Sequence, residues 1–434
     1  MTYNLQLYGI LRRILSEINS QVVDHGDRVA YLYLKMGEFR QLPDDIAFEH
    51  MMLACYAHDI GAYKTEKFLD LLRFDVTHTL EHCIYGYLFM KYFSPLMDDA
   101  EVLIYHHTFY NERDKFSSPF LDEGILIHFL DRIDILSIGE SDDNEIYRRL
   151  KDLSGLNFNP SDVDDFIAAD RKYHLLEKLR DGSYSRDVES YFNKAEHCER
   201  LIRPIINMLA YEIDFKSEQT VIHSITTTLL AQDLAVKMNL PEKSCEELEY
   251  AARLHDLGKI DIAGGILEKP GRLTADEYCI MKKHVTFTKE IIKDLFPDNI
   301  VSIAYRHHER LDGSGYPEGL SAESLSLQDR ILQVADVTSA LLQKRSYKEA
   351  LDKEVVIKIL TEESQAGRLD KNVIDELISD YDSIIGDLWT RSSHIISLYE
   401  NLQTEFGRYL NEFSSADHDG SEEFGLFSGM IQKS

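Results

Sequence analysis

The feature that most restricts the fold of this chain is a repeated order of histidines and aspartates. The order is a single histidine, a His-Asp pair, another single histidine, a His-His pair and a final aspartate. In the second half these residues are His223, His255, Asp256, His284, His307, His308 and Asp336. In the first half they are His25, His58, Asp59, His82, His106, His107 and Asp131. Matched positions lie 197 to 205 residues apart, far beyond the period of a solenoid, so two related tandem domains are predicted.

The spacing of apolar residues predicts helices throughout. Apolar side chains recur every three or four residues, as in "ILQVADVTSALL" at 331–342, and the chain has only 9 prolines. No stretch alternates like a strand. The predicted fold is therefore all-α, with bundles over 1–140 and 216–413, a helical connector over 141–215 and a mobile tail over 414–434. One helix is expected to start at Leu240-Pro241 and to end at Gly258.

Composition excludes several classes of partner. The formal net charge of −29 argues against binding to polymeric nucleic acid, which needs a basic face. The N-terminus lacks signal-peptide features and no apolar stretch approaches 18 residues, so no membrane partner is expected. The 5 cysteines form no CxxC pair and are interpreted as reduced core residues of a cytoplasmic protein.

The ligand types in each series predict a metal site. Five imidazoles and two carboxylates exceed what one tetrahedral zinc ion needs. They suit two divalent ions of borderline hardness, iron or manganese first, with nickel or magnesium as alternatives. A bridging aspartate would let the two ions share a hydroxide and stabilise a phosphoryl displacement. A lone His-Asp pair does not predict a metal site. One such pair, His418-Asp419 in the tail, has no further histidine or aspartate in a matched order.

The second series resembles a known family. His255-Asp256 with Asp336 resembles the HD phosphohydrolase superfamily, and "DGSGYP" at 312–317 with the further histidines resembles its HD-GYP branch over roughly 215–350. Members are helical phosphodiesterases that open cyclic dinucleotides. The tandem arrangement is similar to bacterial hydrolases of 3′,3′-cGAMP and cyclic di-GMP. The resemblance implies hydrolysis of either or both to linear 5′-phosphorylated dinucleotides, and no single residue decides between them.

The resemblance also implies roles for individual residues. One ion would be held by His223, His255, Asp256 and Asp336. Asp256 would bridge to a second ion held by His284, His307 and His308. Lys259 and Asp256 would be catalytic, with the lysine neutralising charge on the scissile phosphate. The implied substrate-binding residues are Arg310, Asp312, Gly315, Tyr316, Arg345 and Lys348. Gly313 and Gly315 are expected to permit the backbone angles of the loop.

Some positions depart from the family pattern. Gln219 stands where some members carry a glutamate that supports a third ion, so two ions are predicted. Ser339 replaces a common acidic residue, and Ser346 replaces a common proline. In the first half, Ala62 stands where the lysine is expected and no GYP loop follows. The first domain is therefore a degenerate HD domain that could be a regulatory or fold-stabilising unit, a metallophosphatase for the linear product, or a metal-binding unit without turnover.

Two other functions compete with cyclic dinucleotide hydrolysis. One is an HD-type phosphohydrolase of dNTPs or alarmones, and the GYP loop counts against it. The other is a non-catalytic cyclic dinucleotide receptor. The complete ligand series and Lys259 count against that reading. Helical bundles also allow self-association, but the sequence sets no oligomeric state.

Overall fold

The computed structural model describes residues 7–62, 80–214, 218–267, 269, 271–343 and 351–416. Within these ranges the chain forms α-helices and short 3-10 helices, and the only β-type pairings are two isolated bridges. The prediction of an all-α fold is confirmed. Among the described helices, none has both the length and the apolar character needed to cross a membrane.

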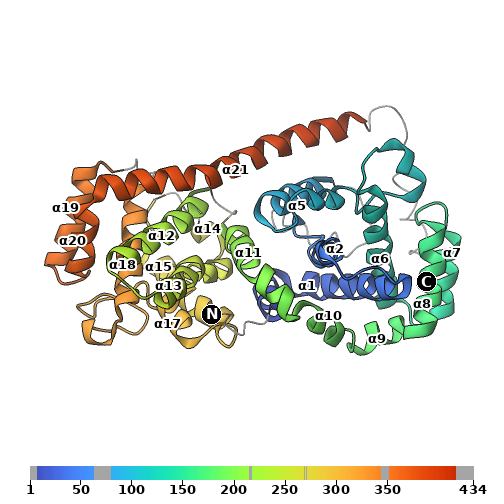
Figure 1. Ribbon diagram of the computed structural model, residues 1–434, viewed down its shortest axis with the longest axis horizontal. Coiled ribbons are helices and arrows are strands. Elements are labelled where there is room, and N and C mark those ends of the chain that lie inside the picture. The colour runs from blue at the N-terminus through green and yellow to red at the C-terminus, as the bar shows by residue number, and fades with distance from the viewer. Residues whose placement is uncertain are drawn as a thin grey trace. The chain divides into compact units, whose positions relative to one another are not determined.

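The chain divides into two compact units. The C-terminal unit comprises Met1–Ile18 and Ile206–Leu398, and the N-terminal unit comprises Asn19–Ile205 and Tyr399–Ser434. The boundaries fall inside three helices, α1 (Leu7–Arg40), α11 (Ala195–Asp214) and α21 (Tyr381–Ala416). Figure 1 shows these three helices with the others. The sequence-based boundaries, at 140/141 and 215/216, fall at other positions along the chain.

The segment expected as a connector, 141–215, belongs to the N-terminal unit up to Ile205. Its aromatic residues fill that unit's core. Phe158 and Phe166 lie with their ring centroids 5.2 and 6.0 Å from that of Phe129, and all three side chains are fully buried. Burial of three aromatic rings against one another stabilises a core far more than a solvated linker could, so this segment is part of the domain.

The C-terminal unit surrounds its ligand residues with six elements. Helix α12 (Glu218–Lys237) packs against α13 (Glu242–Leu254) and α18 (Leu327–Leu342). Helix α16 (His284–Ile292) packs against α17 (Asp298–Tyr305) and the short helix η3 (Leu257–Asp261). The other elements are α14 (Gly264–Leu267), α15 (Ala275–Met281), η4 (Ala322–Ser324), α19 (Lys353–Gln365) and α20 (Lys371–Ser379).

The N-terminal unit repeats the pattern. Here α5 (Leu80–Phe93), α2 (Ile46–Tyr56) and α6 (Leu121–Gly139) pack against the short helix η1 (Met97–Ile104). The other elements are η2 (Tyr110–Lys115), α7 (Asp143–Asp152), α8 (Pro160–Tyr173), α9 (Leu175–Asp181) and α10 (Ser185–Phe192).

The glycine of the His-Asp turn has a packing role rather than the predicted helix-ending role. Helix α13 ends at Leu254, before His255. A Cβ added at Gly258 would lie 2.1 Å from the carbonyl oxygen of His284, and one added at Gly61 would lie 2.0 Å from that of His82. Only glycine lets each His-Asp turn approach the helix that carries the next histidine.

Several predicted features lie outside the described residues. These are Arg345, Ser346, Lys348 and the tail beyond Ala416. The side chain of Gln219 is likewise not described, so the prediction of two ions rather than three stays a prediction. Residues 414–416, expected in the tail, end helix α21.

Candidate metal centres

The seven predicted residues of the C-terminal unit meet in one place. The Nε2 atom of His223 lies 3.0 Å from Asp336 Oδ1 and 3.8 Å from Asp256 Oδ2. His284 Nε2 lies 3.4 Å from the other Asp256 oxygen, Oδ1. Asp256 therefore stands between the two groups of histidines. The remaining distances are 3.2 Å for His255 Nε2 to Asp256 Oδ2, 3.9 Å for His307 Nε2 to Asp256 Oδ1 and 3.6 Å for His308 Nδ1 to Asp336 Oδ2.

Local backbone geometry orients three of these rings. The Nδ1 atoms of His255, His284 and His307 each lie 2.7 to 2.8 Å from the carbonyl oxygen three residues earlier. A carbonyl can only accept, so each Nδ1 carries the hydrogen and donates. Each neutral ring then presents the Nε2 lone pair, and the Nε2 atoms of His284 and His307 face each other at 3.3 Å. A fixed tautomer of this kind is usual for metal-ligating histidines.

Electrostatics keep the carboxylates charged. Burial alone would raise the pKa of Asp256, but His255 and Lys259 hold that pKa well below its usual range. Burial alone would likewise raise the pKa of Asp336, but His223 and His308 lower it. Burial lowers the pKa of His308 to about 3 although Asp336 opposes this. At neutral pH the centre thus combines two carboxylates with at least one neutral imidazole.

A divalent cation fits this centre. The Nε2 of His255 and the Oδ1 of Asp256 are buried and make no hydrogen bond among the described residues. A buried polar atom without a partner costs about 1–3 kcal/mol, and a charged one costs more. His223, His255 and Asp256 form one group that could hold an ion, and His284, His307 and His308 form another. Nitrogen and oxygen donors of this kind match the borderline metals predicted from the sequence.

Lys259 lies beside the bridging aspartate. Its Nζ donates to Asp256 Oδ2 at 2.5 Å. The lysine is in η3, and its side chain is 19% exposed. It can therefore reach both the carboxylate and a ligand that enters from solvent.

The GYP loop folds over His308. The ring of Tyr316 lies 4.8 Å from that of His308, between centroids, and the Tyr316 amide donates to the His308 carbonyl. Gly313 has φ +76° as predicted. Gly315 does not have positive φ, which corrects the prediction for it. A Cβ there would lie 2.4 Å from the Arg310 nitrogen, so close packing requires the glycine.

Two other predicted substrate residues occupy different positions in this loop. The Nη1 atom of Arg310 is buried and makes no hydrogen bond within the described parts of the chain. The exposed Asp312 instead accepts from the Ser314 amide at 3.0 Å and from its hydroxyl at 2.6 Å. This turn holds the loop in shape.

Sequence reasoning missed Glu309, the residue that closes the GYP loop. Its carboxylate is fully buried and accepts from the amides of Glu318, Gly319 and Leu320 at 2.7, 3.2 and 2.9 Å. The only sequence signal was a glutamate directly after the His-His pair. Three amide donors on one carboxylate make this a strong, charge-assisted anchor.

Replacing Glu309 with alanine is expected to lower the free energy of unfolding by about 3 kcal/mol, because three backbone amides lose their charged acceptor. Urea unfolding would measure the loss, and hydrogen exchange at the amides of residues 318–320 should accelerate. The exposed Glu323, in the neighbouring helix η4, provides the matched alanine control. Unchanged exchange at these three amides in Glu309→Ala would contradict the anchor.

The seven predicted residues of the N-terminal unit form a second centre. His25 Nε2 lies 3.2 Å from Asp131 Oδ1 and 3.9 Å from Asp59 Oδ2. The Nε2 atoms of His82 and His106 lie 3.3 Å apart and each 3.6 Å from Asp59 Oδ1. These distances match those of the C-terminal unit. The same backbone device orients His58 and His106, whose Nδ1 atoms donate to the carbonyls of Cys55 and Leu103.

The two centres differ at the residue behind the first histidine. His25 Nδ1 donates to Asp134 at 2.7 Å, and Arg28 also contacts Asp134. In the C-terminal unit, Ser339 stands opposite His223 Nδ1 at 3.0 Å. The repeat would have revealed this pair, because 134 and 339 are separated by the same interval as 131 and 336. A carboxylate that accepts a hydrogen bond from Nδ1 raises the basicity of the imidazole more than a hydroxyl at the same position.

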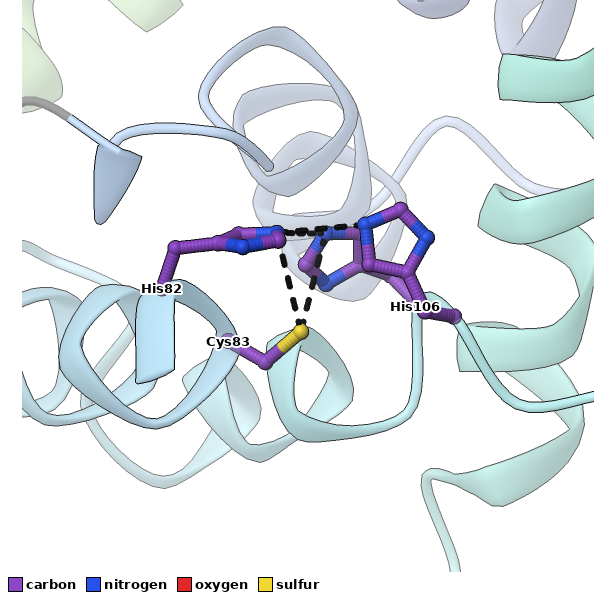
Figure 2. Close-up of side chains that lie close together, drawn as sticks. His82, Cys83 and His106 are labelled. Carbon is purple, nitrogen blue, oxygen red and sulfur yellow. Dashed lines mark hydrogen bonds between the residues drawn. The ribbon is translucent and has the colours of Figure 1, made fainter. Parts of the chain in front are cut away.

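Three more groups have no counterpart in the C-terminal centre. Arg132 donates to Asp131 Oδ2 at 2.6 Å, and His128 is buried beside the same carboxylate. Cys83 Sγ lies 3.7 Å from the Nε2 of His82 and 4.0 Å from that of His106, as Figure 2 shows. The interpretation of Cys83 as an ordinary core cysteine was therefore incomplete.

Charges around the N-terminal centre shift its pKa values. Burial alone would lower the pKa of His25, but the neighbouring carboxylates of Asp131 and Asp134 raise it to about 10. Burial alone would raise the pKa of Cys83, but His106 and His82 lower it to about 6. By contrast, burial raises the pKa of the Cys55 thiol.

A metal ion also fits the N-terminal centre. His58 Nε2, Asp59 Oδ1 and Asp131 Oδ1 are buried and have no hydrogen-bond partner in the part of the chain that is described. Groups of three and four ligand atoms surround them. The donors include nitrogen, oxygen and sulfur.

Comparison with known proteins gives the chain a family context. Residues 203–373 match the family described as HD domain. The 3′3′-cGAMP-specific phosphodiesterase 1 of Vibrio cholerae is 27% identical over 395 residues, 86% of this chain and 90% of that protein. The cyclic di-GMP phosphodiesterase response regulator RpfG of Xanthomonas campestris is 36% identical over 50% of this chain and 58% of its own length. The crystal structure of V-cGAP3, a cyclic GMP-AMP phosphodiesterase of V. cholerae, aligns with a TM-score of 0.49 at 18% identity, covering 87% of this chain and 97% of that one. Residues 203–373 are therefore similar to the HD domain family, and the chain is similar in sequence to these two phosphodiesterases.

Proposed function

We propose that the protein is a metal-dependent phosphodiesterase that hydrolyses cyclic dinucleotides, 3′,3′-cGAMP, cyclic di-GMP or both, to linear 5′-phosphorylated dinucleotides. The observation that carries the proposal is the convergence of six ligand residues, most of them buried, around Asp256, next to the solvent-reaching cation Lys259. The homology to phosphodiesterases that are named for these two substrates supports it.

The ligand set divides into two groups that share Asp256. His223, His255 and Asp336 would hold one divalent ion with it, and His284, His307 and His308 would hold the second. Such a pair, iron or manganese by ligand type, supplies Lewis acidity and activates water as a nucleophile.

The chain's own residues would perform three tasks. The carbonyl hydrogen bonds of His255, His284 and His307 keep their rings in place before substrate arrives. Lys259 would place an ammonium beside the scissile phosphate, where negative charge grows during the displacement. Arg310 and Tyr316 would bind the base or phosphate at the loop, with Gly315 keeping the backbone close. Asp312 would act by holding the loop.

Turnover of a substrate panel tests this proposal. The Mn²⁺- or Fe²⁺-loaded protein is incubated with cyclic di-GMP, 3′,3′-cGAMP, cyclic di-AMP, a dNTP and an alarmone. We expect linear dinucleotides from one or both guanine-containing rings. Hydrolysis of the dNTP or alarmone alone would instead identify a nucleotide phosphohydrolase. Tight cyclic dinucleotide binding without hydrolysis would identify a receptor.

For the N-terminal centre we propose removal of the 5′-phosphate from the linear product. The specific observation is that this centre keeps all seven ligand residues and adds Arg132, which is 7% exposed and bound to Asp131. An arginine fork binds phosphate well and could replace the lysine that is absent at Ala62. The lack of a GYP loop would leave room for a linear chain end.

Replacing both His58 and Asp59 with alanine should therefore abolish phosphate release from a linear dinucleotide, because two ligand residues are lost. Ring opening of the cyclic substrate should stay within about twofold, as the change lies in the other unit. Phosphate release and dinucleotide products are measured separately. The matched double variant His255→Ala/Asp256→Ala should show the opposite pattern. Unchanged phosphate release in the first variant would contradict this role.

A further inference from the structure

Position 83 distinguishes the donor chemistry of the two centres. Cys83 directly follows His82 in α5, and its side chain is 2% exposed. The corresponding residue after His284 is Val285, which is fully buried and offers no ligand atom. The C-terminal centre is therefore built from nitrogen and oxygen donors, whereas the N-terminal one also has a sulfur within reach.

Four of the six distances among the sulfur and three imidazole nitrogens are close to those of a tetrahedral site. The His82 Nε2 atom lies 3.3 Å from His106 Nε2, and Cys83 Sγ lies 3.7 Å from the former and 4.0 Å from the latter (Figure 2). The His82 Nε2 atom also lies 3.1 Å from His107 Nε2. A tetrahedral zinc ion with its usual bond lengths has N···N edges of about 3.3 Å and N···S edges of about 3.6 Å. The four ligand atoms of this group all lie within 4.8 Å of one another.

A second, independent observation points to a cation at this position. Asp59 is 6% exposed, and its Oδ1 atom has no hydrogen-bond partner in the described parts of the chain. That oxygen points to the same imidazoles, at 3.6 Å from the Nε2 atoms of both His82 and His106. His106 donates its Nδ1 hydrogen to Leu103, so its Nε2 lone pair faces the group. Lone pairs converging on a buried carboxylate oxygen repel one another unless a cation lies among them.

We propose that the N-terminal centre binds a zinc-class divalent ion through the thiolate of Cys83 and the imidazoles of His82, His106 and His107. Binding replaces the thiol proton, which leaves to solvent. A thiolate ligand shifts selectivity toward softer metals than an all-nitrogen-and-oxygen set does. The two centres of one chain would then hold different metals. This inference concerns metal chemistry and does not depend on the proposed substrate of either centre.

Cobalt substitution tests the proposal with a readout independent of activity. The full chain carrying His255→Ala/Asp256→Ala, which weakens the C-terminal centre, is loaded with Co²⁺ alone. We expect a thiolate-to-cobalt charge-transfer band in the near ultraviolet together with visible bands of tetrahedral cobalt. Adding Cys83→Ser should remove the charge-transfer band. Cys55→Ser is the matched control, because Cys55 is a fully buried thiol of the same unit outside the four-residue group, and it should keep the band.

A second measurement keeps the test decisive if Cys83→Ser does not fold. X-ray absorption at the zinc edge, on the Zn²⁺-loaded background protein with Cys83 present, should show one sulfur at about 2.3 Å and nitrogens at about 2.0–2.1 Å. Bound metal with only nitrogen and oxygen neighbours would overturn the proposal. A charge-transfer band that survives Cys83→Ser and disappears in Cys55→Ser would also overturn it.

Discussion

Replacing Asp256 with asparagine is expected to lower kcat/KM for cyclic dinucleotide hydrolysis by about 10³-fold or more. Losing one member of a catalytic set that acts as a unit has effects of this scale or larger. Asp256 touches both groups of histidines, with Oδ2 near His223 and Oδ1 near His284. Its pKa is held well below the usual range by His255 and Lys259, so the substitution removes a full negative charge at neutral pH.

Metal analysis accompanies the rate measurement. The Asp256→Asn variant should bind substantially less metal in the C-terminal unit. The amide nitrogen of asparagine is a hydrogen-bond donor and cannot ligate an ion, and its neutral oxygen is a weaker ligand than a carboxylate oxygen. Asp298→Asn is a suitable control, since Asp298 is exposed in the first turn of α17. If the Asp256 variant retained both metal and hydrolysis, the aspartate would not be the shared ligand.

Replacing Lys259 with methionine is expected to reduce kcat by about 10²–10³-fold, the cost of losing one preorganised group that stabilises transition-state charge. The Lys259 ammonium donates to Asp256 at 2.5 Å and is partly exposed, so it can contact a phosphate as well. Methionine keeps the length of the side chain but removes the charge. Single-turnover rates and substrate affinity are measured separately. The rate should fall, and the affinity should change little.

Metal content separates this role from a structural one. Lys259→Met should keep its metal, since no lysine nitrogen ligates an ion in the proposed site. Lys289→Met is the control. Lys289 is on the neighbouring helix α16 and lies over the ring of Tyr305. If Lys259→Met lost metal in proportion to activity, the lysine would be supporting Asp256 rather than the phosphate.

The repeat was sufficient to predict the fold class and which side chains lie close together, whereas their binding of metal stays a prediction. A matched order of histidines and aspartates predicts that the members of each series lie close together in space. The structure places all fourteen residues in two centres. The repeat also contained a signal for Asp134, which occupies the position that matches Ser339 in the second half. Only a position-by-position comparison of the flanking residues would have revealed it.

Residues without a partner in the repeat could not be predicted in the same way. Glu309 and Cys83 each directly follow a ligand histidine, but adjacency in sequence does not reveal what a side chain faces. Glu309 acts on amides up to 11 residues further along the chain. The segment 141–215 was expected as a connector because polar and charged residues are frequent in it. Aromatic residues such as Phe158 decide instead where its larger part, up to Ile205, packs.

The order of residue types thus determined which side chains gather, because a metal ligand set is defined by chemistry and count. Tertiary packing decided how they are used. The close approach at Gly258 and Gly61 sets the distance between the His-Asp turn and the next histidine. Packing across elements likewise places Cys83 near His106, which lies on a different segment, and Arg132 against one carboxylate oxygen. Such contacts depend on distances of a few tenths of an ångström between distant segments, and a linear pattern does not encode them.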